Sequence, residues 1–191
     1  MNLPNLPRIN VDIQQAARFA KHIHRNQKRK YSGVPYAFHL ARVAGYTALL
    51  DDVQDFMIAA AWLHDSVEDQ GHQCSFELIE SLFGQDTASC VRYLTNTNHD
   101  PEMRRADRKQ ADRDRLSRVP WGILRIKLLD RYDNINDIPP SETKFATLYA
   151  QETHLLLDAI KPYRVCNSAE YETLHTMLRD RTIALEDAIK K

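Results

Sequence analysis

An apolar run that ends abruptly in acidic residues is the feature that most constrains the fold of this chain. Residues 56–63, Phe-Met-Ile-Ala-Ala-Ala-Trp-Leu, contain neither glycine nor proline and predict a buried helix. Residues 64–69, His-Asp-Ser-Val-Glu-Asp, follow directly, and we expect them on the last turns of the same helix. Acidic side chains at a helix C-terminus oppose the helix dipole, and buried ionisable groups are costly unless they are neutralised. The pattern favours a bound divalent cation over a solvated helix end.

Two more residues are candidate ligands for this ion. His64 and Asp65 offer an imidazole and a carboxylate, and a catalytic metal centre needs three or four protein ligands. His39 lies in an otherwise apolar stretch, where a lone histidine is more often a core residue that bonds a carbonyl. Asp130 ends another apolar helical run, and an ion pair with Arg131 is the alternative explanation for it. Because two ligands do not complete a metal site, we favour the role of metal ligand for both His39 and Asp130.

The rest of the chain predicts an all-α fold. Only five glycines occur among the 191 residues, and alternating β-branched patterns are scarce. We expect one domain over residues 1–191, a bundle of about eight to ten helices, because no repeat or domain boundary interrupts the pattern. The candidate N-caps are Asn10 or Asp12, Asp51 or Asp52, and Ser75. The expected helices end near residues 23, 50, 70, 84, 94, 118, 135, 160 and 191.

Composition restricts the partners and the compartment. The 26 basic and 26 acidic residues leave no net charge, so nothing draws the whole chain to nucleic acid or to a membrane. Cys74, Cys90 and Cys166 are far apart, which favours free thiols in a reducing compartment. The N-terminus has no signal-peptide pattern, and no apolar stretch approaches about 20 residues. We expect a cytoplasmic protein that binds neither nucleic acid nor membranes, with homo-oligomerisation left open.

Two further segments have simpler explanations. Residues 102–118 carry seven basic and four acidic side chains, and such mixed signs predict a solvated, salt-bridged helix face. His99-Asp100 is a second His-Asp pair, but Pro101 disfavours a helical conformation at the residue before it. We therefore expect a loop at His99-Asp100 and no second metal site.

Collinear segments resemble the HD-domain metal-dependent phosphohydrolases, and among them the RelA/SpoT-type hydrolases. Residues 24–39 are similar to the basic loop that precedes the first histidine ligand of that family. Residues 64–69 resemble its HD(T/S)VED hexad, and residues 126–134, Ile-Lys-Leu-Leu-Asp-Arg-Tyr-Asp-Asn, resemble its IKLADxLxN segment. The resemblance covers residues 11–153 and includes Glu152-Thr153. The remaining length has no room for a nucleotide-synthetase domain, so the match is to the single-domain small alarmone hydrolases.

The resemblance implies a fold, a reaction and an ion. The fold is a single HD-domain helical bundle, and the reaction removes the 3′-diphosphate of ppGpp or pppGpp to give GDP or GTP and pyrophosphate. The cofactor is Mn2+, one divalent first-row ion per chain, and its implied ligands are His39, His64, Asp65 and Asp130. Glu68 would orient or deprotonate the attacking water, with Asp69 assisting.

The resemblance also implies residues that bind the small-molecule nucleotide substrate. Arg29 would lie across the purine through its planar guanidinium, which lysine cannot reproduce. Lys30 and Ser32 would contact the base or a phosphate, and Asn134 the sugar or the 3′-diphosphate. The loop before the first histidine varies in length within the family, so Lys30 is the alternative to Arg29 as the stacking residue.

Two departures and two alternatives accompany the resemblance. Leu129 stands where the family usually has alanine, and Leu40 where proline often follows the first histidine. The same chemistry could act on an adenine alarmone, (pp)pApp, on NADPH or on another nucleotide phosphoester such as a 5′-nucleotide. A non-catalytic nucleotide sensor is the other alternative, and the presence of all four ligands and both acids disfavours it. The pair Glu68-Asp69 favours alarmone hydrolysis over generic HD nucleotidases but does not read the base.

Overall fold

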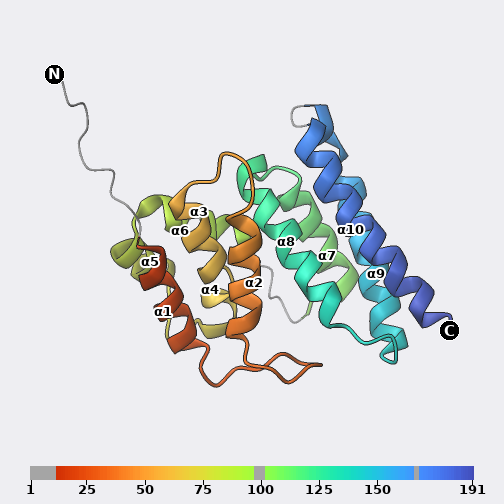
Figure 1. Cartoon of the computed structure of the whole chain (residues 1–191), viewed down its shortest axis with the longest axis horizontal. Helices are drawn as coiled ribbons and strands as arrows, with labels where there is room; N and C mark the ends of the chain where they lie inside the picture. Colours follow the sequence, from red (N-terminus) through yellow and green to blue (C-terminus); the bar gives the residue numbers. More distant parts are fainter. Residues whose placement is uncertain (1–11, 97–101, 166–167) are drawn as a thin grey trace.

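Helices make up nearly all of the regular structure (Figure 1). The structure is a computed structural model that describes residues 12–96, 102–165 and 168–191. Within these residues the only β-type pairing is an isolated bridge between Lys28 and Pro35, so the expected all-α class is confirmed. The elements are α1 (Ile13–Ile23), α2 (Ala37–Thr47), α3 (Asp55–Leu63), α4 (Ser66–Gln70), α5 (Phe76–Phe83), α6 (Gln85–Leu94), α7 (Arg105–Leu116), α8 (Trp121–Asp137), α9 (Thr143–Ala159), a 3-10 helix η1 (Lys161–Val165) and α10 (Ser168–Ile189).

The helix α8 lies between two groups of helices (Figure 1). Ile126 packs into a core built by α1, α2, α3, α5 and α6. Leu124 and Leu128 pack into a second core with α9 and α10. Because α8 has apolar contacts on both sides, the polar residues in its middle turns are also enclosed. Asp130 and Asp133 are 4% and 2% exposed.

The apolar helix α3 packs against α1, α2 and α6, and it ends earlier than its sequence predicts. It ends at Leu63, and α4 begins at Ser66 after a turn formed by His64 and Asp65. Our expectation of one continuous helix through residues 64–69 is therefore wrong. Successive side chains on a helix diverge by about 100°. The turn instead lets His64 Nε2 and Asp65 Oδ2 converge to 3.0 Å.

Two helix N-caps could be predicted from the local sequence. Asp12 Oδ1 accepts the main-chain N–H of Gln15 at 3.0 Å, and Ser75 Oγ accepts that of Leu78 at 3.2 Å. Both caps confirm predictions, and the alternative cap Asn10 lies outside the described residues. Gly84 ends α5 with φ of +84°, a conformation that glycine adopts without strain.

The start of α3 differs from the prediction. The N-cap of α3 is Gln54, whose side chain makes no capping hydrogen bond, so neither Asp51 nor Asp52 caps this helix. Asp52 instead adopts a left-handed conformation with φ of +53°, which aspartate tolerates better than most residues. It lies in the connection that follows α2, and α2 itself ends at Thr47, before the expected residue 50.

The structure describes two of the three cysteines. Cys74 and Cys90 are buried free thiols, whereas Cys166 and the pair His99-Asp100 lie outside the described residues. None of the helices in the described part of the chain has the length and apolar character needed to cross a bilayer.

Candidate metal centre and adjoining cavity

The side chains expected to bind a metal ion converge where α2, the turn after α3 and α8 meet. His39 Nε2 and His64 Nε2 lie 3.2 Å apart. Asp65 Oδ2 lies 3.6 and 3.0 Å from these two nitrogens, and Asp130 Oδ1 lies 3.3 and 3.5 Å from them. Two donor atoms about 2.1 Å from one ion are roughly 3.0 Å apart at octahedral angles and roughly 3.4 Å apart at tetrahedral angles. The donor atoms of His39, His64 and Asp65 all lie within 4.8 Å of one another and fit a single first-row ion, and Asp130 adds an oxygen within 3.5 Å of both imidazole nitrogens.

Hydrogen bonds at the far side of each imidazole direct the Nε2 atoms toward this cluster. His64 Nδ1 lies 2.8 Å from the carbonyl oxygen of Ala61, which can only accept, so Nδ1 carries the proton. His39 Nδ1 lies 2.6 Å from Asp133 Oδ2, with the same consequence. Each neutral ring therefore presents the lone pair of Nε2 to the centre, and both rings are almost fully buried.

The electrostatics of the cluster also fit a cation. Burial opposes ionisation of Asp65 and Asp130, but the imidazoles, and for Asp130 also Lys127, hold both carboxyl pKa values well below their usual range. Burial likewise lowers the pKa of His39, but hydrogen bonds to the surrounding carboxylates outweigh it and raise this pKa to about 9. The pKa of His64 is raised for a similar reason, mainly through the charge of Asp65.

Three neighbours of the cluster escaped the sequence analysis. Lys127 Nζ lies 2.8 Å from Asp130 Oδ2, and Asp133 receives the His39 hydrogen bond. Both residues are three positions from Asp130 on α8, so their helical spacing could have identified them. Tyr36 donates its phenolic O–H to Asp65 Oδ2 at 2.6 Å. No local pattern links Tyr36 to a residue 29 positions away, because that contact depends on tertiary packing.

The two expected acid–base residues have different surroundings. Glu68 lies on α4, accepts the main-chain N–H of Asn96 at 3.0 Å through Oε2 and lines a cavity beside the cluster. Burial raises the pKa of Glu68, against the opposing charge of Lys127. Asp69 accepts a hydrogen bond from Gln27 at 2.7 Å and is not among the residues that line the cavity. The structure therefore brings Glu68, and not Asp69, to the cavity wall.

The cavity has a volume of about 430 Å3, within the range typical of small-molecule sites. It is bounded by the basic loop (residues 27–36) and by parts of α4, α7, α8 and α9. Asp130 and Lys127 form its wall at the metal cluster, and Phe145 and Tyr149 supply aromatic surface from α9. Its basic lining residues are Lys28, Arg29, Lys30, Lys109, Arg113, Lys127 and Arg131. Its acidic lining residues are Glu68, Asp112, Asp130, Asp137 and Glu152, so basic side chains are in excess, which suits an anionic nucleotide.

The charged helix α7 has the exposed, salt-bridged face that we predicted, with an ion pair between Arg115 and Asp112, but its other side contributes to this cavity. Lys109 and Arg113 line the cavity, and Asp112 is only 9% exposed. Arg105 holds α7 against α9 through two hydrogen bonds to the Glu152 carboxylate, at 2.9 and 3.1 Å. The alternation of charge along α7 carries no information about which face α9 covers, so sequence alone could not separate the two sides.

Only some of the residues expected to bind substrate lie at the cavity. Arg29 is 7% exposed, and its Nε and Nη1 donate to Asp137 at 3.1 Å and to Asn134 at 2.8 Å. Asn134 in turn donates to Asp130 Oδ1 at 2.6 Å, which connects Arg29 to the metal cluster. Lys30 lines the cavity, with Nζ 5.2 Å from the Phe145 ring centroid. These contacts bring Arg29, Lys30 and Asn134 to the cavity.

Ser32 behaves differently from these neighbours. It is exposed in the turn of the basic loop and is not among the residues that line the cavity. Hydrogen bonds between Arg29 and Val34, and between Gly33 and Arg29, fix this turn, in which Gly33 has φ of +70°. A contact between Ser32 and substrate stays a prediction.

Comparison with known proteins agrees with this geometry. A family model described as the HD domain matches residues 16–157. The chain therefore belongs to the HD-domain family, as its motifs predict.

Its relatives share one activity in their names. The zebrafish (Danio rerio) guanosine-3′,5′-bis(diphosphate) 3′-pyrophosphohydrolase MESH1 is 29% identical over 91% of this chain and 96% of its own length. The Drosophila melanogaster protein of the same name is 32% identical over 66% of this chain and 69% of its own length. A solved structure described as a metazoan ortholog of SpoT that hydrolyzes ppGpp matches 93% of this chain and 98% of its own, with a TM-score of 0.68 and 25% identity.

Proposed function

We propose that this protein is a pyrophosphohydrolase of ppGpp and pppGpp that depends on a divalent first-row ion. The observation that carries the proposal is that a carboxylate oxygen of Asp65 and one of Asp130 each lie 3.0 to 3.6 Å from two imidazole nitrogens, which are themselves 3.2 Å apart, beside a cavity whose basic lining residues outnumber the acidic ones. The named activity of relatives that match nearly the full chain supports the substrate. The buried free thiols of Cys74 and Cys90 support the cytoplasm as the place of action.

The proposed ion is Mn2+, one per chain. The residues that would hold it are His39, His64, Asp65 and Asp130. Two imidazole nitrogens and two carboxylate oxygens suit Mn2+ and other first-row ions better than Ca2+ or Mg2+, which prefer oxygen ligands alone. When bound, the ion supplies Lewis acidity, which lowers the pKa of a water and polarises the phosphoryl group.

Glu68 is the proposed general base. A water oxygen forms a bond to the phosphorus next to O3′, the P–O3′ bond breaks, and pyrophosphate leaves while O3′ takes up a proton from solvent. The Glu68 carboxylate receives the proton of the water, and burial, which raises its pKa, makes it a stronger base. Asp69 assists from outside the cavity, because its negative charge contributes to the raised pKa of Glu68. Lys127 is partly buried, with Nζ 2.8 Å from Asp130 Oδ2, and its positive charge acts on both Asp130 and Glu68.

Arg29 is proposed to stack on the purine. A guanidinium forms hydrogen bonds in its plane, so the bonds to Asp137 and Asn134 fix that plane. The Tyr36 ring centroid lies 5.8 Å from Arg29 Cζ, and Arg29 lines the cavity in which the purine would stack. Lys30 is the alternative stacking residue, and Ser32 and Asn134 are proposed contacts to base or phosphate and to the sugar region. Lysine at position 29 would keep the charge and lose both the flat face and the two-point attachment.

We expect Arg29→Lys to raise KM with little change in kcat. A cation over an aromatic face contributes about 0.5–2 kcal/mol, so KM should rise by roughly three- to thirty-fold. The loss of a contact made equally in ground state and transition state leaves turnover at saturation nearly unchanged. Steady-state kinetics of Arg29→Lys beside Lys30→Ala decide between the two residues. Wild-type kinetics for Arg29→Lys with a large KM defect for Lys30→Ala would assign the stacking to Lys30.

A substrate panel tests the function itself. The purified protein is incubated with Mn2+ and, in turn, ppGpp, ppApp, NADPH and a 5′-nucleotide, and pyrophosphate and orthophosphate are assayed separately. We expect pyrophosphate from ppGpp and none from the His64→Ala control. Pyrophosphate mainly from ppApp would change the base preference, and orthophosphate from NADPH would change the substrate class. Nucleotide binding without any turnover would indicate a sensor.

A further inference from the structure

An ion pair between a buried carboxylate and a partly exposed arginine lies directly behind one of the two histidines of the metal cluster. Asp133 Oδ2 accepts a hydrogen bond from His39 Nδ1 at 2.6 Å. The same carboxylate accepts two hydrogen bonds from Arg42, from Nε to Oδ1 at 2.5 Å and from Nη2 to Oδ2 at 3.0 Å. His39 and Arg42 belong to α2 and Asp133 to α8, so these bonds join the two helices that carry His39 and Asp130.

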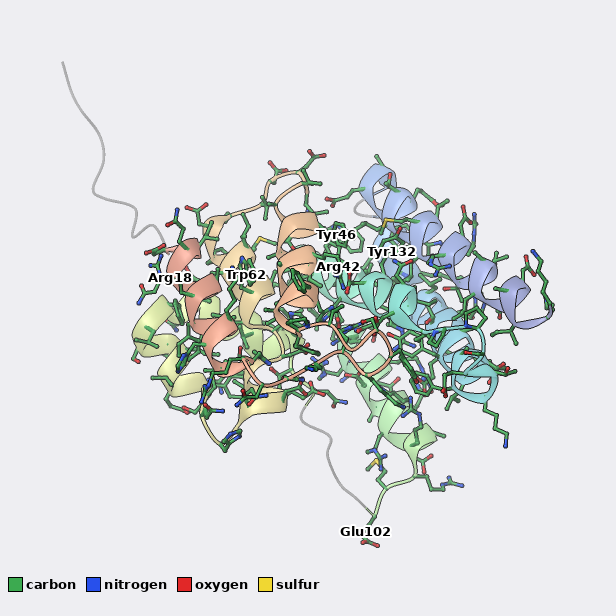
Figure 2. The ribbon with its side chains drawn as sticks, turned by 60° about the horizontal axis from the view of Figure 1, so that its bottom comes forward. Arg18, Arg42, Tyr46, Trp62, Glu102 and Tyr132 are labelled. Atoms are coloured by element: carbon green, nitrogen blue, oxygen red, sulfur yellow. The ribbon has the colours of Figure 1, made fainter. Side chains whose placement is uncertain are left out.

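The surroundings of this ion pair keep it in place. Figure 2 shows Arg42 and Tyr46 of α2 on the side of the helix that faces Tyr132 of α8. The rings of Tyr46 and Tyr132 meet edge to face, with centroids 6.1 Å apart. Arg42 is 42% exposed as a side chain, whereas Asp133 is 2% exposed. The carboxylate is thus enclosed, and its arginine partner closes it off from solvent.

The two imidazoles of the cluster are therefore oriented by different means. His64 donates to the main-chain carbonyl of Ala61, which no side-chain substitution removes. His39 depends on the side chain of Asp133. An ionised carboxylate only accepts hydrogen bonds, so it fixes the proton of His39 on Nδ1 and the lone pair on Nε2. It also makes the ring a better electron donor.

Arg42 has a separate effect on this arrangement. Its guanidinium contacts both oxygens of Asp133, and such two-point pairing fixes the plane of a carboxylate. It also supplies the positive charge that a buried carboxylate needs, since Asp133 adds a third carboxylate close to His39 besides Asp65 and Asp130.

We propose that Asp133 and Arg42 are positioning residues of the metal centre: Asp133 holds His39 in the orientation and tautomer that bind the ion, and Arg42 holds Asp133. This inference rests on the proposed function, because it takes His39 as a metal ligand. Neither residue is among those that line the cavity, but Asp133 Oδ2 also lies 4.0 Å from Nη2 of Arg29, which does line it. In the part of the chain that the structure describes, Arg42 has no such contact with a lining residue among its hydrogen bonds, so its effect is expected on the affinity for the ion.

The test measures metal affinity directly in the metal-free full chain, by competition for Mn2+ with a fluorescent chelator. Removal of an outer hydrogen-bond partner of a metal-bound histidine typically weakens metal binding by about 10- to 100-fold, and we expect this loss for Asp133→Ala. Arg42→Ala should weaken binding less, because His39 keeps its acceptor. With saturating Mn2+, the KM for ppGpp should stay at the wild-type value in Arg42→Ala, whereas Asp133→Ala also removes the ion pair with Arg29 and is therefore judged by Mn2+ affinity.

A control variant separates the loss of His39 positioning from a general loss of protein stability. Glu170→Ala removes another carboxylate paired with a buried arginine of α8, since Glu170 Oε1 lies 2.6 Å from Arg125 Nη1. We expect Glu170→Ala to lower the unfolding temperature and to leave Mn2+ affinity unchanged. Asp133→Asn provides a second variant, because asparagine keeps the volume and one acceptor; it should bind Mn2+ with an affinity between those of the wild type and Asp133→Ala.

The outcomes are distinct. Wild-type Mn2+ affinity in Asp133→Ala and Asp133→Asn would overturn the role of Asp133, and wild-type affinity in Arg42→Ala would overturn that of Arg42. Equal losses in Asp133→Ala and Glu170→Ala would show a general effect of stability and would also overturn the inference. Failure of the wild-type protein to bind Mn2+, or undiminished binding in His64→Ala, would contradict the proposed metal centre itself.

Discussion

His64→Ala and Asp65→Asn are each expected to lose the bound ion and the hydrolytic activity together. His64 is 1% exposed, and its Nε2 lies within 3.5 Å of a donor atom from each of the other three residues of the cluster. Alanine leaves a space without a donor, and asparagine replaces an anionic ligand by a neutral amide of the same shape. Elemental analysis should fall from about one first-row ion per chain to almost none.

Chelation gives the same expectation without a substitution. Wild-type protein treated with EDTA should lose activity, keep most of its helical circular dichroism and recover activity when Mn2+ is restored. Helicity should persist because the apolar contacts of α3 and α8, and not the ion, fill the two cores. Full activity after EDTA treatment, or normal metal content in His64→Ala, would contradict the assignment of the centre.

The site was predictable from sequence to the extent that short segments carry its chemistry. His39, His64, Asp65 and Asp130 stood out because each is polar in or beside an apolar run, and a buried polar group needs a partner. The structure brings all four within 3.6 Å of a neighbouring donor atom. The sequence shows that these four polar side chains are unfavourable to bury singly, and the structure offsets this by bringing them together.

Other features depend on packing between distant segments, which local patterns do not encode. The turn at His64 and Asp65 interrupts a stretch whose composition favours continuous helix, and contacts with α2 and α8 decide it. The hydrogen bond between Tyr36 and Asp65 depends on how the basic loop folds back. The inner face of α7, with Asp112 buried, is set by the contact with α9. Periodicity predicts that a helix has a buried face but not which neighbour covers it.

Glu68→Gln is expected to keep the ion and to lower kcat by on the order of 10²-fold or more. Glutamine has nearly the same shape, and its carbonyl oxygen can still accept the main-chain N–H of Asn96 that holds Glu68 Oε2 at 3.0 Å. The amide cannot accept the proton of the attacking water. Metal analysis and steady-state kinetics on the same preparation separate binding of the ion from turnover.

Asp69→Asn is the matched control for this prediction. Asp69 lies next to Glu68 in sequence, but it accepts its hydrogen bond from Gln27 and lies outside the cavity lining. An effect that acts only through the pKa of Glu68 should lower kcat much less than Glu68→Gln does. Loss of the ion from Glu68→Gln would make Glu68 a metal ligand, and unchanged kcat would exclude it as the base. An equally large loss in Asp69→Asn would show that Asp69 takes part in proton transfer, because weakening the charge near Glu68 cannot by itself remove the base.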